Sequence, residues 1–270
     1  MKNGNGNHVD PDFENLGEAW RRSIPHGISA AGRGVGRIRF CRPHFCALNI
    51  LALETSTEIC SAALWLDGKV DAREAVAGQR NSELLLPMVD ALLAANQLAA
   101  RDLDGVAFGS GPGAFTGVRI ACGVAQGIAF GIDVPVAAIG TLMALAEAAG
   151  APRAVCCLDA RMGEVYHAAY ERRGDAWFEV HAPGLYKPAA VPELPAGEWV
   201  GCGSGFSVFR DELMARYSGT VARVIDGVIP HAREIAVLAA RQFSRGETVA
   251  AEDALPLYVR NKVALKVNER

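Results

Sequence analysis

The chain lacks the features that would tie it to a membrane or to a disulfide framework. No apolar run reaches the roughly 18 to 20 residues that span a bilayer without several glycines or polar side chains, and the longest is 118–130. The seven cysteines include no CxxC pair and lie mostly within apolar segments, as reduced core thiols do. These absences predict a soluble, cytoplasmic protein without membrane contact.

Histidine is scarce and scattered, which argues against the common metal sites. No two of the six histidines have metal-ligand spacing, and three fall in the first 46 residues. They are His8, His26, His44, His167, His181 and His231. We therefore predict no metal site and no cofactor.

The charge of the chain is unevenly distributed along its 270 residues. Residues 1–46 carry seven basic and four acidic residues, so the chain totals of 27 and 30 leave 20 basic and 26 acidic residues in 47–270, a net charge of −6. Affinity for nucleic-acid phosphates comes largely from lysine and arginine, so this acidic part is poorly suited to hold RNA alone. A stand-alone RNA-binding module is disfavoured, and any work on RNA requires a partner.

The first 47 residues differ from the rest. The start is polar and rich in glycine and asparagine, and the stretch 19–53 has six arginines and no acidic residue. We expect residues 1–47 to be a disordered extension, or the result of a start site assigned too early. A transit peptide is the alternative, but the acids between Asp10 and Glu18 and the scarcity of serine argue against it.

From residue 48 onwards, regular patterns predict an α/β lobe with a mixed sheet. Three short runs separated by tight turns predict an antiparallel meander, and strands then alternate with helices. The expected strands are 49–56, 60–68, 69–76, 105–111 and 134–140, and the expected helices are 83–96, 116–131 and 141–149. Ser82 and Thr141 are the expected helix N-caps.

A second copy of this lobe is expected after residue 150. The run 154–161 resembles the first strand, and 164–175 resembles the hairpin that follows it. Each opening strand ends in an acid, Glu54 in the first copy and Asp159 in the second. The sequence thus predicts two duplicated lobes, 48–150 and 151–270, each with a mixed sheet and crossover helices.

The segment GSGPGAFTGVR (109–119) joins an expected strand to an expected helix. Its glycines let the backbone turn tightly and approach another group, while the helix N-terminus points N–H groups into the same space. A phosphate-binding loop and a structural turn are both compatible with it, but a P-loop is not, since no Gly-Lys-Ser/Thr ending follows. Nearby hydroxyls of Ser56, Ser110 and Thr116 have no histidine close in sequence, which argues against a peptidase.

Glycine recurs at four-residue spacing in the helix 116–131, next to a stripe of alanines. Each internal glycine costs up to about 1 kcal/mol relative to alanine, so close approach of another element is expected to offset that cost. Either the chain's own sheet or a partner fills this role, and the excess apolar surface of the helix 83–96 favours a partner. The predicted interface residues are Leu84, Leu85, Met88, Leu92, Arg119, Gly123, Gly127 and Gly131.

Five segments taken together resemble the TsaB (YeaZ) family. Within about residues 48–263 they read ILALETSTEICSAALW, SELLLPMVDALL, GPGAFTGVRIACGVAQGIAFG, DARMGEVYHAAY and PLYVRNKVA. The resemblance implies an actin-like ASKHA fold and a part in adding threonylcarbamoyl to the adenosine beside the tRNA anticodon. It also implies pairing with the catalytic paralogue TsaD through the two helices, self-association as a homodimer when alone, work with the ATPase TsaE, and contact with tRNA only through that complex.

The resemblance further implies a scaffold that has no catalytic residue. The catalytic paralogue holds a metal with a His-x-x-x-His pair after the strand matching 134–139, where this chain has none. In this superfamily a glycine usually follows each tip acid so that phosphates can approach, but Thr55 and Ala160 stand there. The predicted vestigial nucleotide cleft consists of Glu54, Thr55, Ser56, Gly111, Gly113, Asp159 and Arg161. The alternative is an independent ATPase or small-molecule kinase that uses Glu54 and Asp159 around magnesium.

Two smaller expectations concern single side chains. Arg161 is either a phosphate ligand or the partner of a neighbouring carboxylate such as Glu164. Trp65, Trp177 and Trp199 lie in strand-like runs and are expected to pack in the core rather than to stack on bases.

Overall fold

The computed structural model describes residues 48–259, and the predictions for residues 1–47 and 260–270 lie outside this range. The first half of the described chain contains β1 (Asn49–Glu54), β2 (Ile59–Leu66), β3 (Lys69–Val76), α2 (Asn81–Ala95), β4 (Gly105–Gly111), α3 (Phe115–Ile132), β5 (Val136–Gly140) and α4 (Thr141–Ala149). The second half contains β6 (Arg153–Asp159), β7 (Val165–Arg173), β8 (Ala176–Tyr186), β9 (Trp199–Cys202), α5 (Ser204–Val208), α6 (Arg210–Arg216), β10 (Val221–Ile225) and α7 (Ala232–Arg245).

The first sheet has the strand order β3-β2-β1-β4-β5. Strands β1, β2 and β3 pair antiparallel, whereas β4 pairs parallel to both β1 and β5. Asp67 and Gly68 both have positive φ, 47° and 91°, which is the backbone of a tight two-residue hairpin turn. The predicted meander, its turn and the order of strands and helices are confirmed.

Both predicted N-caps are wrong. Helix α2 begins at Asn81 after Arg80, so Ser82 lies inside its first turn. Helix α4 begins at Thr141 itself, with Gly140 in the cap position. The Thr141 hydroxyl instead accepts a hydrogen bond from the backbone N–H of Gly111 (3.1 Å), so it supports the glycine-rich loop.

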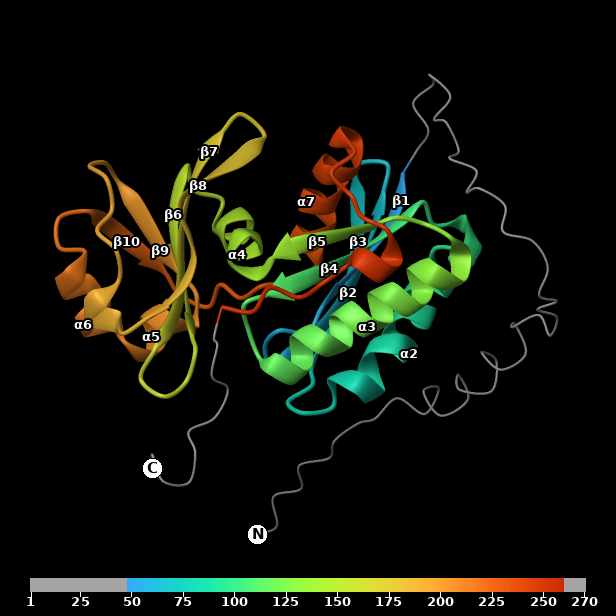
Figure 1. Ribbon diagram of the computed structural model, residues 1–270, viewed down its shortest axis with the longest axis horizontal. Helices are drawn as coiled ribbons and strands as arrows, with labels where there is room; N and C mark the ends of the chain where they lie inside the picture. The colour runs from blue at the N-terminus through green and yellow to red at the C-terminus, as the bar shows by residue number, and fades with distance from the viewer. Residues whose placement is uncertain (1–47, 260–270) are drawn as a thin grey trace, which may run out of the picture. The chain divides into compact units, whose positions relative to one another are not determined.

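The second sheet repeats the order of the first. Its order, β10-β9-β6-β7-β8, places β6 where β1 stands, with antiparallel β7 and β8 on one side and parallel β9 and β10 on the other. Figure 1 shows the two sheets as separate blocks, one blue to green and one yellow to orange. The repeat predicted from two weakly similar strand tips is therefore present in the topology.

Side-chain alternation along β1 builds a layer on each face of the first sheet. Leu51 and Leu53 join a core formed with α2 and α3, whereas Ile50 and Ala52 join a core formed with α7. All four side chains are fully buried. The first sheet is thus covered by helices on both faces, and β1 lies at its centre.

The last helix of each half of the chain packs on the sheet formed by the other half. Helix α7 packs on the first sheet, and α4 packs on the second through Leu142 and Leu145, which join a core with Cys156 and Ala154. The opposite face of the second sheet is covered by α5 and α6. The predicted lobe boundary at residue 150 stays a prediction, because these two helices carry contacts across it.

Candidate functional site

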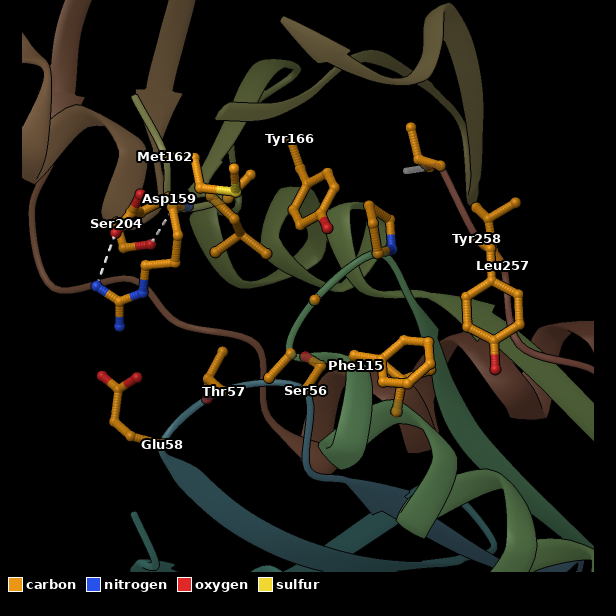
Figure 2. Close-up of a pocket in the computed structure, with 18 of the residues that line it drawn as sticks. Ser56, Thr57, Glu58, Phe115, Asp159, Met162, Tyr166, Ser204, Leu257 and Tyr258 are labelled. Atoms are coloured by element: carbon orange, nitrogen blue, oxygen red, sulfur yellow. Dashed lines mark hydrogen bonds and ion pairs between the residues drawn. The ribbon is translucent and has the colours of Figure 1, made fainter. Parts of the chain in front are cut away.

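A cavity of about 670 Å³ lies where the loops after β1 and β6 meet the glycine-rich loop and the C-terminal segment. Of the predicted cleft residues, Ser56, Gly113, Asp159 and Arg161 line it. Figure 2 shows Ser56 and Phe115 on one side, Asp159 and Ser204 on another, and Leu257 and Tyr258 on a third. The duplicated strand tips therefore do meet around a common space.

Glu54 does not face this cavity. Its side chain is fully buried, and its Oε1 accepts a hydrogen bond from the backbone N–H of Ser56 at 2.5 Å. Oε2 has no hydrogen-bond partner among residues 48–259, and burial raises the pKa of this carboxyl to about 7 despite the hydrogen bonds at Ser56. Glu54 thus lies buried beneath its own loop, and this member of the predicted vestigial cleft does not line the cavity.

The glycines of the 109–119 segment are needed for close packing on the β1 tip. A Cβ at Gly109 would overlap the Glu54 carboxylate, a Cβ at Gly117 would overlap the Thr55 carbonyl oxygen, and one at Gly113 would lie 2.6 Å from the Ser56 Cβ. The Thr55 hydroxyl also donates to the Gly117 carbonyl at 2.7 Å. Thr55 and Gly111 are both buried, and neither lines the cavity.

The acid at the end of β6 pairs with an arginine two residues later. The Arg161 guanidinium pairs with the Asp159 carboxylate at 3.0 Å, and the Arg161 backbone N–H donates to the same carboxylate at 2.8 Å. Arg161, Met162 and Gly163 have φ of 62°, 57° and 72°, a run of left-handed residues that turns the chain back towards β7. Arg161 therefore pairs with a neighbouring carboxylate, and that carboxylate is Asp159.

The described part of the chain places neither a metal centre nor a serine paired with a histidine at the cavity. No group of three or more His, Cys, Asp or Glu residues within 48–259 is arranged to hold a metal ion. Among residues 48–259, the cavity lining contains Ser56 and Ser204 but neither histidine nor cysteine. The five cysteines in the described part of the chain are free and buried, as expected of reduced core thiols.

Three of the predicted interface residues belong to the protein's own core. Leu85, Met88 and Leu92 on α2 are 0–7% exposed and pack with the first sheet and α3, so the prediction that they contact a partner is wrong. Leu84 is half-buried against the same cluster. The helix absorbs its excess apolar surface because it lies against β2, β3 and α3 together.

Helix α3 turns its alanines inward and the glycines of its four-residue stripe outward. Ala121, Ala125 and Ala129 are fully buried, whereas a Cβ added at Gly123, Gly127 or Gly131 would meet no atom of residues 48–259 within 4 Å beyond the adjacent residues and the backbone of α3 itself. The neighbouring Phe130 is 76% exposed. The glycine stripe is therefore not needed for packing within residues 48–259.

By length and composition α3 also qualifies as a membrane-spanning segment, contrary to the sequence expectation, although only one third of it is buried. A single helix of this kind is weak evidence for a membrane. This one packs against β4 and the first sheet. The apolar residues of α3 therefore lie partly on a face that packs in the core and partly on a face that the rest of residues 48–259 leaves uncovered.

Arg119 lies between the glycine stripe and the cavity. Its guanidinium lies over the Phe115 ring, 3.7 Å from the centroid, and its Nε donates to the Tyr258 hydroxyl at 2.8 Å. The four-residue spacing to Phe115 is a helical signal visible in the sequence, but the contact with Tyr258 spans 139 residues. The segment that carries Tyr258 is held by the Leu257 N–H, which donates to the Ser110 carbonyl at 2.7 Å.

Comparisons with known proteins agree on one family. Residues 75–265 match the family model described as TsaD, tRNA N6-adenosine threonylcarbamoyltransferase. The protein named tRNA threonylcarbamoyladenosine biosynthesis protein TsaB from Escherichia coli K12 is 40% identical over 227 residues, which cover 81% of this chain and 97% of that protein. The protein of the same name from Haemophilus influenzae is 35% identical over 232 residues, covering 81% and 96%.

The solved structures lead to the same family. A Pseudomonas aeruginosa protein described as similar to peptidase YEAZ has a TM-score of 0.73 and 38% identity, and the match covers 79% of this chain and all of that one. A second structure, described as YeaZ from the same organism, has a TM-score of 0.72. Together with the two repeated mixed sheets, these likenesses identify an actin-like ASKHA fold. The chain belongs to the TsaB (YeaZ) family, whose named members are proteins of tRNA threonylcarbamoyladenosine biosynthesis.

Proposed function

We propose that this protein is a non-catalytic subunit that pairs with a TsaD-like threonylcarbamoyltransferase through the outward face of α3. The observation that carries the proposal is the open glycine stripe, at which no side chain of residues 48–259 comes within reach of an added Cβ. Three internal glycines weaken a helix by about 1 kcal/mol each relative to alanine. A partner element that approaches the bare backbone closely offsets that cost.

The surroundings of the acidic residues at the ends of β1 and β6 support the absence of catalysis by this chain. Glu54 is buried beneath its own loop, and Asp159 is paired with Arg161. Magnesium held between two such acids needs both carboxylates to face one space, and only Asp159 lines the cavity. On this proposal, the chain contributes structure to the transfer rather than chemistry.

The proposed contact with tRNA is inferred from the net charge of the chain, and the proposed ATPase partner is inferred from the family. The net charge of −6 over residues 47–270 leaves tRNA contact to the complex as a whole, and the ATPase expected in that complex is TsaE-like. We place this assembly in the cytoplasm, where tRNA is modified. When the catalytic subunit is absent, the same face of α3 is free to join two copies of this chain.

Replacing Gly127 with leucine tests the proposal. The new side chain enters open space, so the chain should fold normally, but it should block close approach of a partner helix. Ala215→Leu is the matched control, because it adds a leucine at an exposed position of α6, on the second sheet. With the TsaD-like subunit of the same organism, the unchanged protein and Ala215→Leu should co-elute in gel filtration, while Gly127→Leu elutes alone. An intact complex with Gly127→Leu overturns the proposal.

The cavity volume favours a second candidate, an independent ATPase or kinase. A space of about 670 Å³ is within the range of small-molecule sites, and Asp159, Arg161 and Ser204 offer polar groups. Calorimetry of the purified chain with ATP and magnesium separates the two candidates. Tight binding with turnover and no partner present supports the kinase, whereas no heat and no hydrolysis supports the scaffold.

A further inference from the structure

One carboxylate joins elements that belong to the two sheets. Glu147 on α4 accepts two hydrogen bonds from Arg241 on α7, from Nη1 to Oε2 and from Nη2 to Oε1, both at 2.9 Å. Oε2 also accepts the indole N–H of Trp177 on β8 at 2.6 Å, and Oε1 lies 3.7 Å from an Nη atom of Arg172 on β7. Each carboxylate oxygen therefore has one partner in α7 and another in the β7–β8 hairpin.

These partners lie in two different bodies of the fold. The first body is the first sheet with α2, α3 and α7, and the second body is the second sheet with α4, α5 and α6. Trp177 and Arg172 hold the Glu147 carboxylate within the second body, whereas Arg241 reaches it from the first. The hydrogen bonds between Glu147 and Arg241 therefore span the junction of the two bodies, where α4 contacts α7 (Figure 1).

The surroundings make this ion pair stronger than one on an open surface. The Glu147 side chain is 11% exposed and that of Arg241 is 23% exposed, so their attraction is screened less than that of an exposed pair. A bidentate pair also fixes direction, because the planar guanidinium must face both carboxylate oxygens. The Trp177 ring packs against the core that contains α7 and against the core that contains α4. The junction is therefore suited to hold one angle between the bodies.

Helix α4 connects this junction to the cavity. At its first residue the Thr141 hydroxyl holds the glycine-rich loop through the Gly111 N–H, and Glu147 lies six residues later, about 9 Å along the helix. The cavity is lined by the glycine-rich loop of the first body and by the loop after β6 of the second. A rotation of one body against the other about α4 would therefore change the width of the cavity.

We propose that Glu147 and Arg241 form a clasp that fixes the angle between the two bodies and so holds the cavity at one width. The proposal concerns the chain alone and does not depend on any partner or on the outward face of α3. Relative motion is the default between two bodies of one chain, and hinge closure about a cavity is its common form. The clasp opposes that motion because the two bodies can separate only if the partly buried carboxylate loses Arg241.

Replacing Arg241 with glutamine tests the clasp. The variant removes both hydrogen bonds across the junction, while Glu147 keeps its partners in the second body, so no buried charge is left alone. Arg153→Gln is the matched control. Arg153 also donates two hydrogen bonds to a glutamate, Glu171, but both residues belong to the second sheet, so the junction stays intact.

The angle is measured as a distance between two spin labels by pulsed electron paramagnetic resonance. One label replaces Glu83 on α2 and the other Ala215 on α6, both exposed, through ketone-bearing residues that leave the native cysteines untouched. We expect a single narrow distance distribution in the otherwise unchanged chain and in Arg153→Gln, and one about twice as wide in Arg241→Gln. Circular dichroism checks that each variant is folded.

A second pair of labels measures the cavity itself. Glu58 and Val208 are exposed and line it from the first and the second body, so labels at these positions should show the same broadening in Arg241→Gln. Broadening between α2 and α6 without broadening across the cavity overturns the link between clasp and cavity. Equal widths in Arg241→Gln and in the control overturn the clasp, as does a broad distribution in the unchanged chain.

A second variant keeps the test decisive if Arg241→Gln does not fold. Arg241→Lys retains the charge, but the ammonium group lacks the planar fork that faces both carboxylate oxygens. Its distance distribution should therefore also be wider than that of Arg153→Gln. An equal width in Arg241→Lys and in the control overturns the clasp in that case.

Discussion

Replacing Glu54 with glutamine should remove a pH dependence of stability that this buried carboxyl imposes. Burial raises its pKa from 4.5 to about 7, because the charged form loses its hydration beneath the 55–56 loop. A shift of that size corresponds to about 3 kcal/mol between the protonated and the ionised folded states.

The sign follows from proton binding. Between pH 4.5 and 7 the folded protein keeps the Glu54 proton while the unfolded chain releases it, so the folded state binds more protons. The free energy of unfolding therefore falls as pH rises, and the contribution that is complete below pH 4.5 is lost as pH passes through about 7. Glutamine has no proton to lose, so the variant lacks this part of the curve.

Urea unfolding at pH 5, 6, 7 and 8 measures the effect. The unchanged protein should lose about 2–3 kcal/mol relative to Glu54→Gln over this range. Only the change with pH is diagnostic, because the amide introduces a fixed cost of its own at the partnerless Oε2 position. Glu83→Gln, an exposed carboxyl on α2, is the control. A difference between Glu54→Gln and the unchanged protein that stays constant from pH 5 to 8 refutes the reasoning.

Two further predictions concern packing and ion pairs. Gly117→Ala should lower the free energy of unfolding by about 1–3 kcal/mol because its Cβ overlaps the Thr55 carbonyl, whereas Gly123→Ala, in open space, should raise it by up to about 1 kcal/mol; urea titration compares them. Burial alone would raise the pKa of Glu147, but hydrogen bonds from Arg241 and Trp177 and the charges nearby lower this pKa on balance. The ionised carboxylate therefore stabilises the fold, and that stabilisation is lost as pH falls and the carboxylate is protonated. Glu147→Gln should therefore lower the melting temperature at pH 7 more than at pH 4, as calorimetry can measure.

The fold could be predicted largely because hydrophobic periodicity and turn residues are local. The meander closed by Gly68, the buried strand at 105–111 and the repeat after residue 150 all depend on neighbours in sequence. Trp199 is fully buried, and Trp65 and Trp177 pack against the core as expected. Helix caps were the exception, since the hydroxyl of Thr141 serves a loop thirty residues away.

The site was harder to predict because its properties depend on which way each side chain points, and residue type alone does not determine that. The sequence shows an acid at the end of β1 but not that the next two residues fold over Glu54. It shows leucines on all sides of α2 but not that three elements cover them, which removed Leu85 and Leu92 from the interface. The contact between Arg119 and Tyr258 joins positions whose proximity only the folded chain creates.

The threonylcarbamoyladenosine content of bulk tRNA tests the central claim most directly. Cells that carry Gly127→Leu in place of the unchanged chain should lose the modification, because the partner can no longer reach the glycine face of α3. Cells that carry Glu54→Gln should keep it, because the acid at the strand tip takes no part in chemistry. Loss of the modification with Glu54→Gln, together with its retention with Gly127→Leu, would contradict the account.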